Sequence, residues 1–137
     1  MRRLSFAVLV PSLLVMSAAA IAAAGDDLMS GVPTPPNAKS LGAQAISYGG
    51  QLARYSTTTN PAGVIASYQQ ALPAAGWTVT GAGGSGSSYG GNAGLQATNG
   101  PKYLSVNAGG PAGQTFVSVC VWPSKPAHDN CGGDSDN

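Results

Sequence analysis

The residue types that carry most enzyme chemistry are nearly absent from the body of this chain. Between Leu28 and His128 there is no aspartate or glutamate, and His128 is the only histidine in the sequence. Carboxylates and imidazoles supply the general acids and bases of hydrolases and most metal ligands. The acidic residues all lie in the two end segments, which lack the rigid support that catalytic geometry needs. The sequence therefore predicts a protein that is not an enzyme and that uses no metal or other cofactor.

Two short motifs match catalytic or cofactor patterns inside a glycine-rich stretch. Residues 86–90 fit G-x-S-x-G, with Ser88 in the nucleophile position, and residues 81–86 fit G-x-G-x-x-G. The first motif needs a preceding strand, a following helix, and a histidine with an acidic partner. The second needs a following helix and an acidic residue about 20 positions further on. Neither context is expected, so a serine hydrolase that uses Ser88 is only a remote alternative.

Aromatic side chains are the better candidates for a function. Tyr55, Tyr103 and Trp122 fall on expected strands, and an exposed aromatic row on a sheet can stack on sugar rings or dock a protein. The alternative is that these rings belong to the core. We expect them to form a binding surface for an envelope protein or polymer.

Charge offers little further guidance. The formal net charge of the full chain is +1, which gives no argument for nucleic acid. Four cations in the expected domain could meet an anionic partner but are more simply explained by solubility; they are Lys39, Arg54, Lys102 and Lys125.

The first 24 residues have the order of an export signal. Arg2 and Arg3 precede an apolar run over residues 4–16, and Ala22–Ala24 supply the small residues that a signal peptidase recognises. An uncleaved anchor is the alternative, which a proline and several alanines weaken. We therefore expect a signal peptide over 1–24 and a periplasmic or secreted protein with no membrane span after its removal.

Cys120 and Cys131 are the only cysteines. In an exported chain, an even number of cysteines at short spacing indicates a disulfide. A redox pair is the alternative, but the spacing is not Cys-x-x-Cys and no helix N-terminus is expected nearby. The sequence predicts a disulfide that ties the C-terminal tail to the strand carrying Cys120.

A hairpin and one helix are the first elements expected to position these residues. Residues 44–48 and 51–57 flank Gly49-Gly50, which favours a hairpin. Asn60 can cap a helix that begins at Pro61 and whose regular part ends at Pro73. Its buried face is expected to consist of Val64, Ile65, Tyr68 and Leu72.

The second half of the chain reads as strands. One strand is expected to begin with residues 77–80, and three more are expected at 95–98, 102–108 and 115–122. Asn99-Gly100, between the first two of these three, is a hairpin signal. The last run is apolar on both faces, as in a central strand. Residues 81–94 are mostly glycine and serine and predict a flexible loop.

These elements predict an α+β fold, with an antiparallel sheet and one helix packed on one face. The expected organisation is a Pro-rich extended lead-in at 25–36, a single domain at 37–126, and a polar tail at 127–137.

Two runs of residues carry a resemblance. Val32–Ala38 (VPTPPNA) and Tyr68–Trp77 (YQQALPAAGW) are similar to segments of small exported bacterial domains of uncharacterised function. In those domains a Pro-Pro-Gly-Ala-like lead-in precedes a hairpin and a helix ending in Tyr-x-x-x-Leu-x-x-x-Gly-Trp. The resemblance covers residues 32–123, with Asn37 where glycine is commoner. It implies export and an α+β fold, and it lends no catalytic residue.

The sequence therefore favours a non-enzymatic binding or accessory module of the cell envelope or extracellular space. The alternative is a structural envelope protein without a discrete ligand. Its mark would be a sheet whose aromatics are all buried and whose outer face carries only Ser, Thr, Gln and Asn.

Overall fold

The computed structural model describes residues 28–87, 90–129 and 131. The expected signal peptide at 1–24 and the serine of the G-x-S-x-G motif, Ser88, lie outside these residues. The strands are β1 (Lys39–Ile46), β2 (Gly50–Thr57), β3 (Thr78–Ser87), β4 (Gly90–Asn99), β5 (Lys102–Pro111) and β6 (Thr115–Trp122), and the helix α2 spans Pro61–Ala74.

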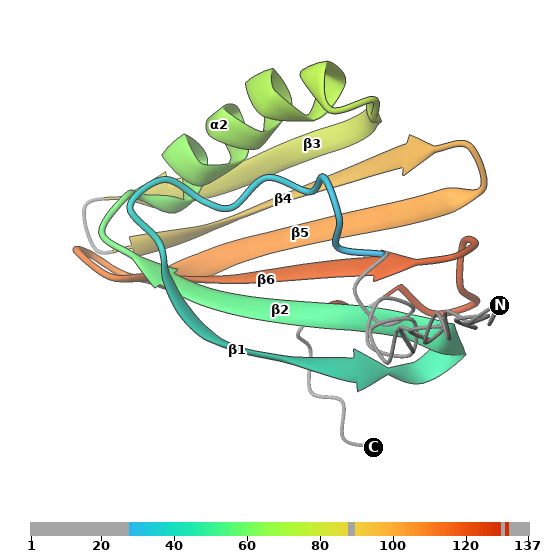
Figure 1. The fold of residues 1–137 in the computed structure, drawn as a ribbon. Coiled ribbons are helices and arrows are strands. Elements are labelled where there is room, and N and C mark those ends of the chain that lie inside the picture. The colour runs from blue at the N-terminus through green and yellow to red at the C-terminus, as the bar shows by residue number, and fades with distance from the viewer. Residues whose placement is uncertain (1–27, 88–89, 130, 132–137) are drawn as a thin grey trace, which may run out of the picture.

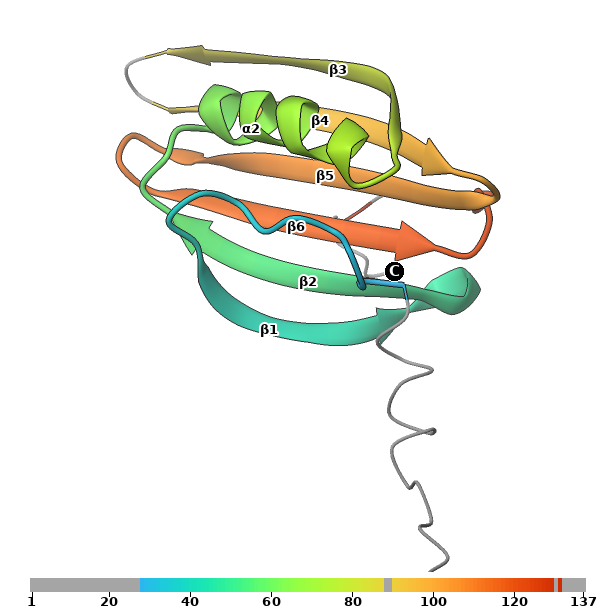
Figure 2. The same cartoon turned by 45° about the horizontal axis from the view of Figure 1, so that its top comes forward.

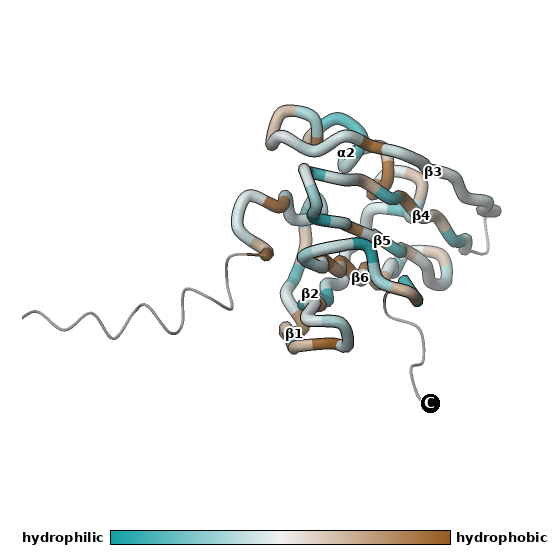
Figure 3. The backbone as a smooth tube through the Cα atoms, turned by 90° about the vertical axis from the view of Figure 1, so that its right-hand side faces the viewer, coloured by the Kyte–Doolittle hydropathy of each residue, from teal (hydrophilic) through white to brown (hydrophobic). Residues whose placement is uncertain are grey.

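The strands form one six-stranded sheet in the order β1-β2-β6-β5-β4-β3, and every neighbouring pair is antiparallel. The chain passes through α2 between β2 and β3, and then returns through β4 and β5 to place β6 beside β2 (Figure 1). Figure 3 views the sheet from one end, so that its strands appear in order from β3 at the top to β1 at the bottom. The expected α+β fold, with its central last strand, is confirmed.

Local signals explain both ends of α2. The Asn60 side chain accepts a hydrogen bond from the Gly63 N–H at 2.6 Å, as an N-cap should. At the other end, the Gly76 N–H bonds to the Pro73 carbonyl at 3.1 Å, and the Trp77 N–H bonds to the Leu72 carbonyl at 3.0 Å. Gly76 has φ +94°, so these bonds form the Schellman motif that glycine favours. The sequence predicts that the regular part of the helix ends at Pro73, and the helix ends one residue later, at Ala74.

The main core lies on the face of the sheet that α2 covers, which we call the helix face. The predicted helical positions Val64, Ile65, Tyr68 and Leu72 are all buried there. They pack on a cluster of apolar sheet residues and on Trp77; the sheet residues are Leu95, Ala97, Leu104, Val106, Ala108, Val117, Val119 and Val121. No helix within the described residues is long and apolar enough to cross a membrane.

The lead-in before β1 covers the part of the helix face that α2 leaves free. It lies on the same side of the sheet as the helix in both ribbon views (Figures 1 and 2). Leu28, Met29 and Val32 pack against the main core. The Tyr68 hydroxyl donates to the Pro33 carbonyl at 2.8 Å, which holds the segment against the helix. The lead-in is therefore a packed part of the domain.

The prediction of a flexible loop at 81–94 is wrong for the described residues of this stretch. They belong to β3 and β4, which pair in a long antiparallel ladder that includes Gly83 with Gly94 and Gly84 with Ala93. Ladder hydrogen bonds use only main-chain groups, so glycine can pair although it adds little side-chain packing. A Cβ on Gly84 would lie 2.6 Å from the Ala93 Cα, so the close approach of the two strands requires glycine there.

Candidate functional site

Two of the three predicted binding aromatics form a buried pair. Tyr103 and Trp122 are register partners on β5 and β6, with ring centroids 5.9 Å apart. They lie on the sheet face opposite α2, which we call the open face, and are only 7% and 2% exposed. Tyr55 is opposite Val117 in the register and packs at the edge of the main core, on the helix face. The exposed row predicted from Tyr55, Tyr103 and Trp122 therefore does not form.

The C-terminal segment explains why the aromatic pair is buried. Cys131 is joined to Cys120 by the predicted disulfide, which draws the segment across the open face. The Trp122 indole N–H donates to the Ser47 carbonyl at 3.1 Å, and the Tyr103 hydroxyl donates to an Asp129 carboxylate oxygen at 2.8 Å. The pair, both cysteines and Leu52 thus make a second, smaller core.

The environment of Tyr103 gives a testable pH dependence. Burial, and then the hydrogen bond and negative charge of Asp129, raise the pKa of Tyr103 from 10.0 to about 12. Above pH 10 the unfolded chain releases this proton while the folded protein keeps it. The stability linked to Tyr103 is therefore complete below pH 10 and is lost as the pH rises toward 12.

This pKa is measurable from the 13Cζ resonance of Tyr103 during a pH titration. We expect a midpoint near pH 12 in the wild type. Asp129→Asn should lower the midpoint, because it removes the charge that disfavours phenolate, but burial should keep it above 10. A wild-type midpoint at the ordinary tyrosine value would contradict the contact with Asp129.

The described residues contain no group of three or more His, Cys, Asp and Glu side chains that could hold a metal ion. His128 is exposed, and its ring centroid is 6.4 Å from that of Tyr48. Gly90, which ends the G-x-S-x-G motif, begins strand β4. The nucleophile elbow needs a helix at this position, so the fold does not supply the context of that motif.

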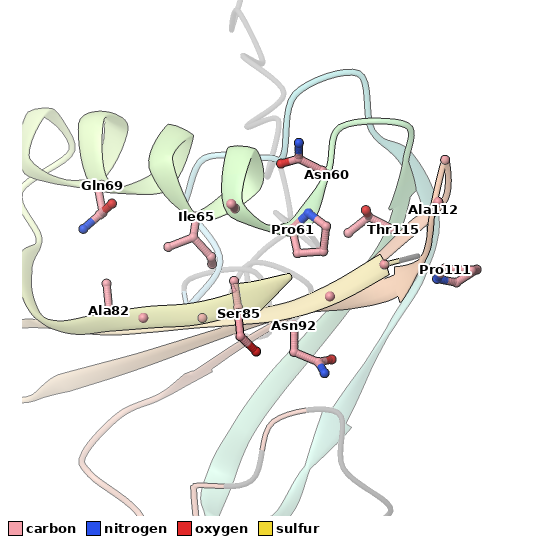
Figure 4. Close-up of a pocket in the computed structure, with 17 residues that line it drawn as sticks. Asn60, Pro61, Ile65, Gln69, Ala82, Ser85, Asn92, Pro111, Ala112 and Thr115 are labelled. Carbon is pink, nitrogen blue, oxygen red and sulfur yellow. The ribbon is translucent and has the colours of Figure 1, made fainter. Parts of the chain in front are cut away.

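A cavity of about 660 Å³ lies between the N-terminal half of α2 and the sheet (Figure 4). We call it the helix cavity. Its lining comes from the helix N-terminus, from β3 and β4, and from the β5–β6 turn with the start of β6; it consists of Asn60, Pro61, Ala62, Ile65, Gln69, Ala82–Ser85, Gly90–Ala93, Pro111–Gly113 and Thr115.

The small residues of the hairpin formed by β3 and β4, which we call the glycine-rich hairpin, create this cavity. The register places Ala82, Gly84 and Ala93 on the helix face, where larger side chains would fill the space beneath α2. Figure 4 shows Gln69 and Ile65 pointing from the helix toward the sheet and Ala82 pointing up at them. A row of residues with little or no side chain under an apolar helix face therefore leaves a cavity with a flat floor.

The lining of the helix cavity has no charged side chain and no cysteine or histidine. Ile65, Ala62 and two prolines give it apolar walls, while Gln69, Asn60 and Thr115 offer amide and hydroxyl groups. Such a lining can bind a neutral molecule through apolar contact and a few hydrogen bonds. It has no carboxylate, imidazole, amine or thiol group beside its two hydroxyls, Ser85 and Thr115.

Sequence reasoning missed this site because it assigned residues 81–94 to a loop. The two glycine-rich runs, 81–87 and 90–94, border the strand signals of Val79 and Leu95. Extending each strand through its glycines would have paired the runs as a hairpin. Their small side chains would then have indicated an empty region of sheet beneath the predicted helix.

No protein-family model, no curated protein and no solved structure matches this chain. The described residues form an α+β domain with one disulfide. A buried aromatic pair lies on the open face of its sheet, and a cavity without charged side chains lies on the helix face.

Proposed function

We propose that this chain is an exported, non-enzymatic binding module whose ligand occupies the helix cavity. The observation that carries the proposal is the cavity itself: it is a cleft whose lining includes exposed residues of α2, β3 and the β5–β6 turn, so a ligand can enter it from solvent. Its volume of about 660 Å³ falls within the range of small-molecule sites, roughly 300–1,000 Å³. Export is supported by the disulfide, which oxidising compartments sustain.

The lining indicates the chemical class of the ligand. A charged ligand would leave its charge uncompensated, because no ionised side chain lines the helix cavity. The floor of Ala82, Gly84 and Ala93 is flat and apolar, and Ile65 closes the opposite wall. A neutral, flat or elongated apolar molecule fits these surfaces, with Gln69 available to hydrogen-bond a polar end.

A structural envelope protein without a discrete ligand is the second candidate. The burial of Tyr103 and Trp122 favours it, whereas Phe116, which is 48% exposed on β6, does not fit a sheet whose aromatics are all buried. It differs from the binding module in one respect that can be measured: nothing should enter the helix cavity.

The test uses N-phenyl-1-naphthylamine, a neutral flat fluorophore that brightens in apolar surroundings. We expect saturable binding at one site of the wild-type protein. Ala82→Phe should weaken it about tenfold or more, a loss of at least ~1.4 kcal/mol, because the new ring fills the cavity from its floor. The control is Ala66→Phe, the same change on the exposed side of α2, which should bind the fluorophore like wild type.

Circular dichroism checks that both variants keep the fold. Absence of saturable binding to the wild type, or equal binding by Ala82→Phe and wild type, would favour the structural envelope protein over the binding module.

A further inference from the structure

A second hollow, of about 710 Å³, lies on the open face of the sheet. We call it the open-face groove. It crosses β3, β4, β5 and β6 and is bordered by the disulfide-bound tail; its lining is Gly83–Ser85, Asn92–Gly94, Asn107–Gly109, Phe116, Ser118 and Cys131. In Figure 4 the side chains of Ser85 and Asn92 point to this side, away from α2. The glycine-rich hairpin thus separates the helix cavity, on the helix face, from the groove, on the open face.

Amide side chains lie flat along the floor of the groove, each over a glycine on the neighbouring strand. Asn92 is paired with Gly109, and a Cβ on Gly109 would collide with the Asn92 Oδ1 atom. Asn107 is paired with Gly94, where an added Cβ would lie 3.2 Å from the Asn107 Oδ1 atom. The glycines therefore provide the space in which these amides lie.

One of the two amides is also held in place by the tail. The Asn107 Nδ2 atom donates to the Cys131 carbonyl at 2.7 Å, which leaves its Oδ1 atom as an acceptor toward the groove. Ser118 is the register partner of Asn107 and adds a hydroxyl beside it. The floor thus carries uncharged groups that can both donate and accept hydrogen bonds, and one of them, Asn107, is held in place by the tail.

Phe116 is the aromatic residue of this lining and is 48% exposed. Its register partners are Gly109 and Ser56, so its neighbours across both adjacent strands are small. A large apolar ring held in water beside a row of amides is well placed to stack on the C–H face of a sugar ring. The amides and hydroxyls then meet the hydroxyls around the edge of that ring.

We propose that the open-face groove binds a neutral polysaccharide chain. The groove is an open channel across four strands, which suits a polymer more than an enclosed small molecule. Its lining has no charged side chain, which matches a neutral glycan. Arg54 lies outside the lining but on the same face, opposite Ser118 in the register, so an acidic glycan is included in the test. The linings of the groove and the helix cavity share Gly83–Ser85, Asn92 and Ala93, but Phe116 lines only the groove and Ala82 lines only the helix cavity.

Affinity electrophoresis tests this inference with the purified protein. Native gels contain dextran, a soluble β-glucan, a galactomannan or the acidic polymer polygalacturonate. We expect at least one neutral polymer to retard the wild type. Phe116→Ala should abolish most of that retardation, with a dissociation constant raised tenfold or more.

A second variant fills the groove without removing a contact. A Cβ on Gly83 would have nothing within 4 Å, and this glycine has no positive φ, so Gly83→Leu should fold normally, project into the groove and block binding. Tyr48→Ala is the matched control, because Tyr48 is an exposed aromatic (53%) that does not line the groove. It should be retarded like wild type, and so should Ala82→Phe, which alters only the helix cavity.

Retardation by none of the neutral polymers, or by polygalacturonate alone, would overturn the inference. So would wild-type retardation of both Phe116→Ala and Gly83→Leu. Because Ala82 lines only the helix cavity and Phe116 lines only the groove, comparing Ala82→Phe with Phe116→Ala distinguishes failure at one site from failure at the other.

Discussion

Replacing Trp122 by alanine is expected to lower the free energy of unfolding by about 4 kcal/mol. Trp122 is 2% exposed, packs against Tyr103 and donates its indole N–H to the Ser47 carbonyl. The substitution removes the largest side chain of the smaller core and leaves a cavity beneath the C-terminal segment. For a domain of this size, the melting temperature should fall by roughly 20 °C. Urea unfolding of the oxidised protein measures the free energy directly.

Phe116→Ala is the control for this prediction, because it removes an aromatic ring from the same strand and the same face. Phe116 is largely exposed, so its loss should change the free energy of unfolding by less than about 1 kcal/mol. Trp122→Phe should fall between the two, since it keeps an aromatic ring but loses the indole N–H. Equal effects of Trp122→Ala and Phe116→Ala would show that Trp122 is exposed, and the aromatic row inferred from the sequence would again be a candidate binding surface.

The second large effect is expected from removal of the disulfide. The double variant Cys120→Ala, Cys131→Ala should lose about 3 kcal/mol of unfolding free energy in the chain-entropy model, because a short loop is no longer closed in the unfolded chain. Cys120 is fully buried and Cys131 lies in the smaller core, so packing losses add to this figure. The measurement is urea unfolding of the variant beside the oxidised wild type.

Reduction of the wild type is the matched comparison for the double variant. The wild type with a thiol reductant should unfold at a lower urea concentration than without it, whereas the double variant should be indifferent to reductant. If the reduced and oxidised wild types unfold at the same urea concentration, the disulfide contributes nothing to stability. The tail would then be held over Tyr103 by its hydrogen bonds, from Tyr103 to Asp129 and from Asn107 to the Cys131 carbonyl.

These two effects separate the residues that hold the fold from those proposed to bind. Tyr103, Trp122 and the disulfide pack together on the open face and are expected to affect stability. The helix cavity and the open-face groove are instead built on the small residues of β3 and β4. Substitutions there that add volume where the backbone leaves space, such as Gly83→Leu, are expected to change binding more than stability.

Features that depend on short-range interactions could be predicted from the sequence. Asn60, Pro61 and Gly76 specify the ends of α2 through capping bonds that span only a few residues. The apolar residues of 115–122 indicated a central strand, and β6 lies between β2 and β5. The disulfide also followed, because the chain contains only two cysteines.

The sites could not be predicted, because they depend on which strands pair and in what register. Gly83 and Gly84 have little strand propensity of their own, and only the ladder with β4 makes them part of a sheet. The same register decides which face each residue occupies. It places Tyr55 on the helix face and Tyr103 on the open face, although both were expected on one surface.

The amino-acid sequence alone determined the scarcity of acid–base groups in the body of the chain, the capped helix, the central strand and the cysteine pair. These follow from composition or from contacts between residues close along the chain. Only the tertiary structure decided that a glycine-rich segment forms two strands, that the tail covers an aromatic pair, and that hollows lie on both sides of β3 and β4. The physical reason is that strand register and side-chain cover arise from contacts between distant segments, which no local pattern encodes.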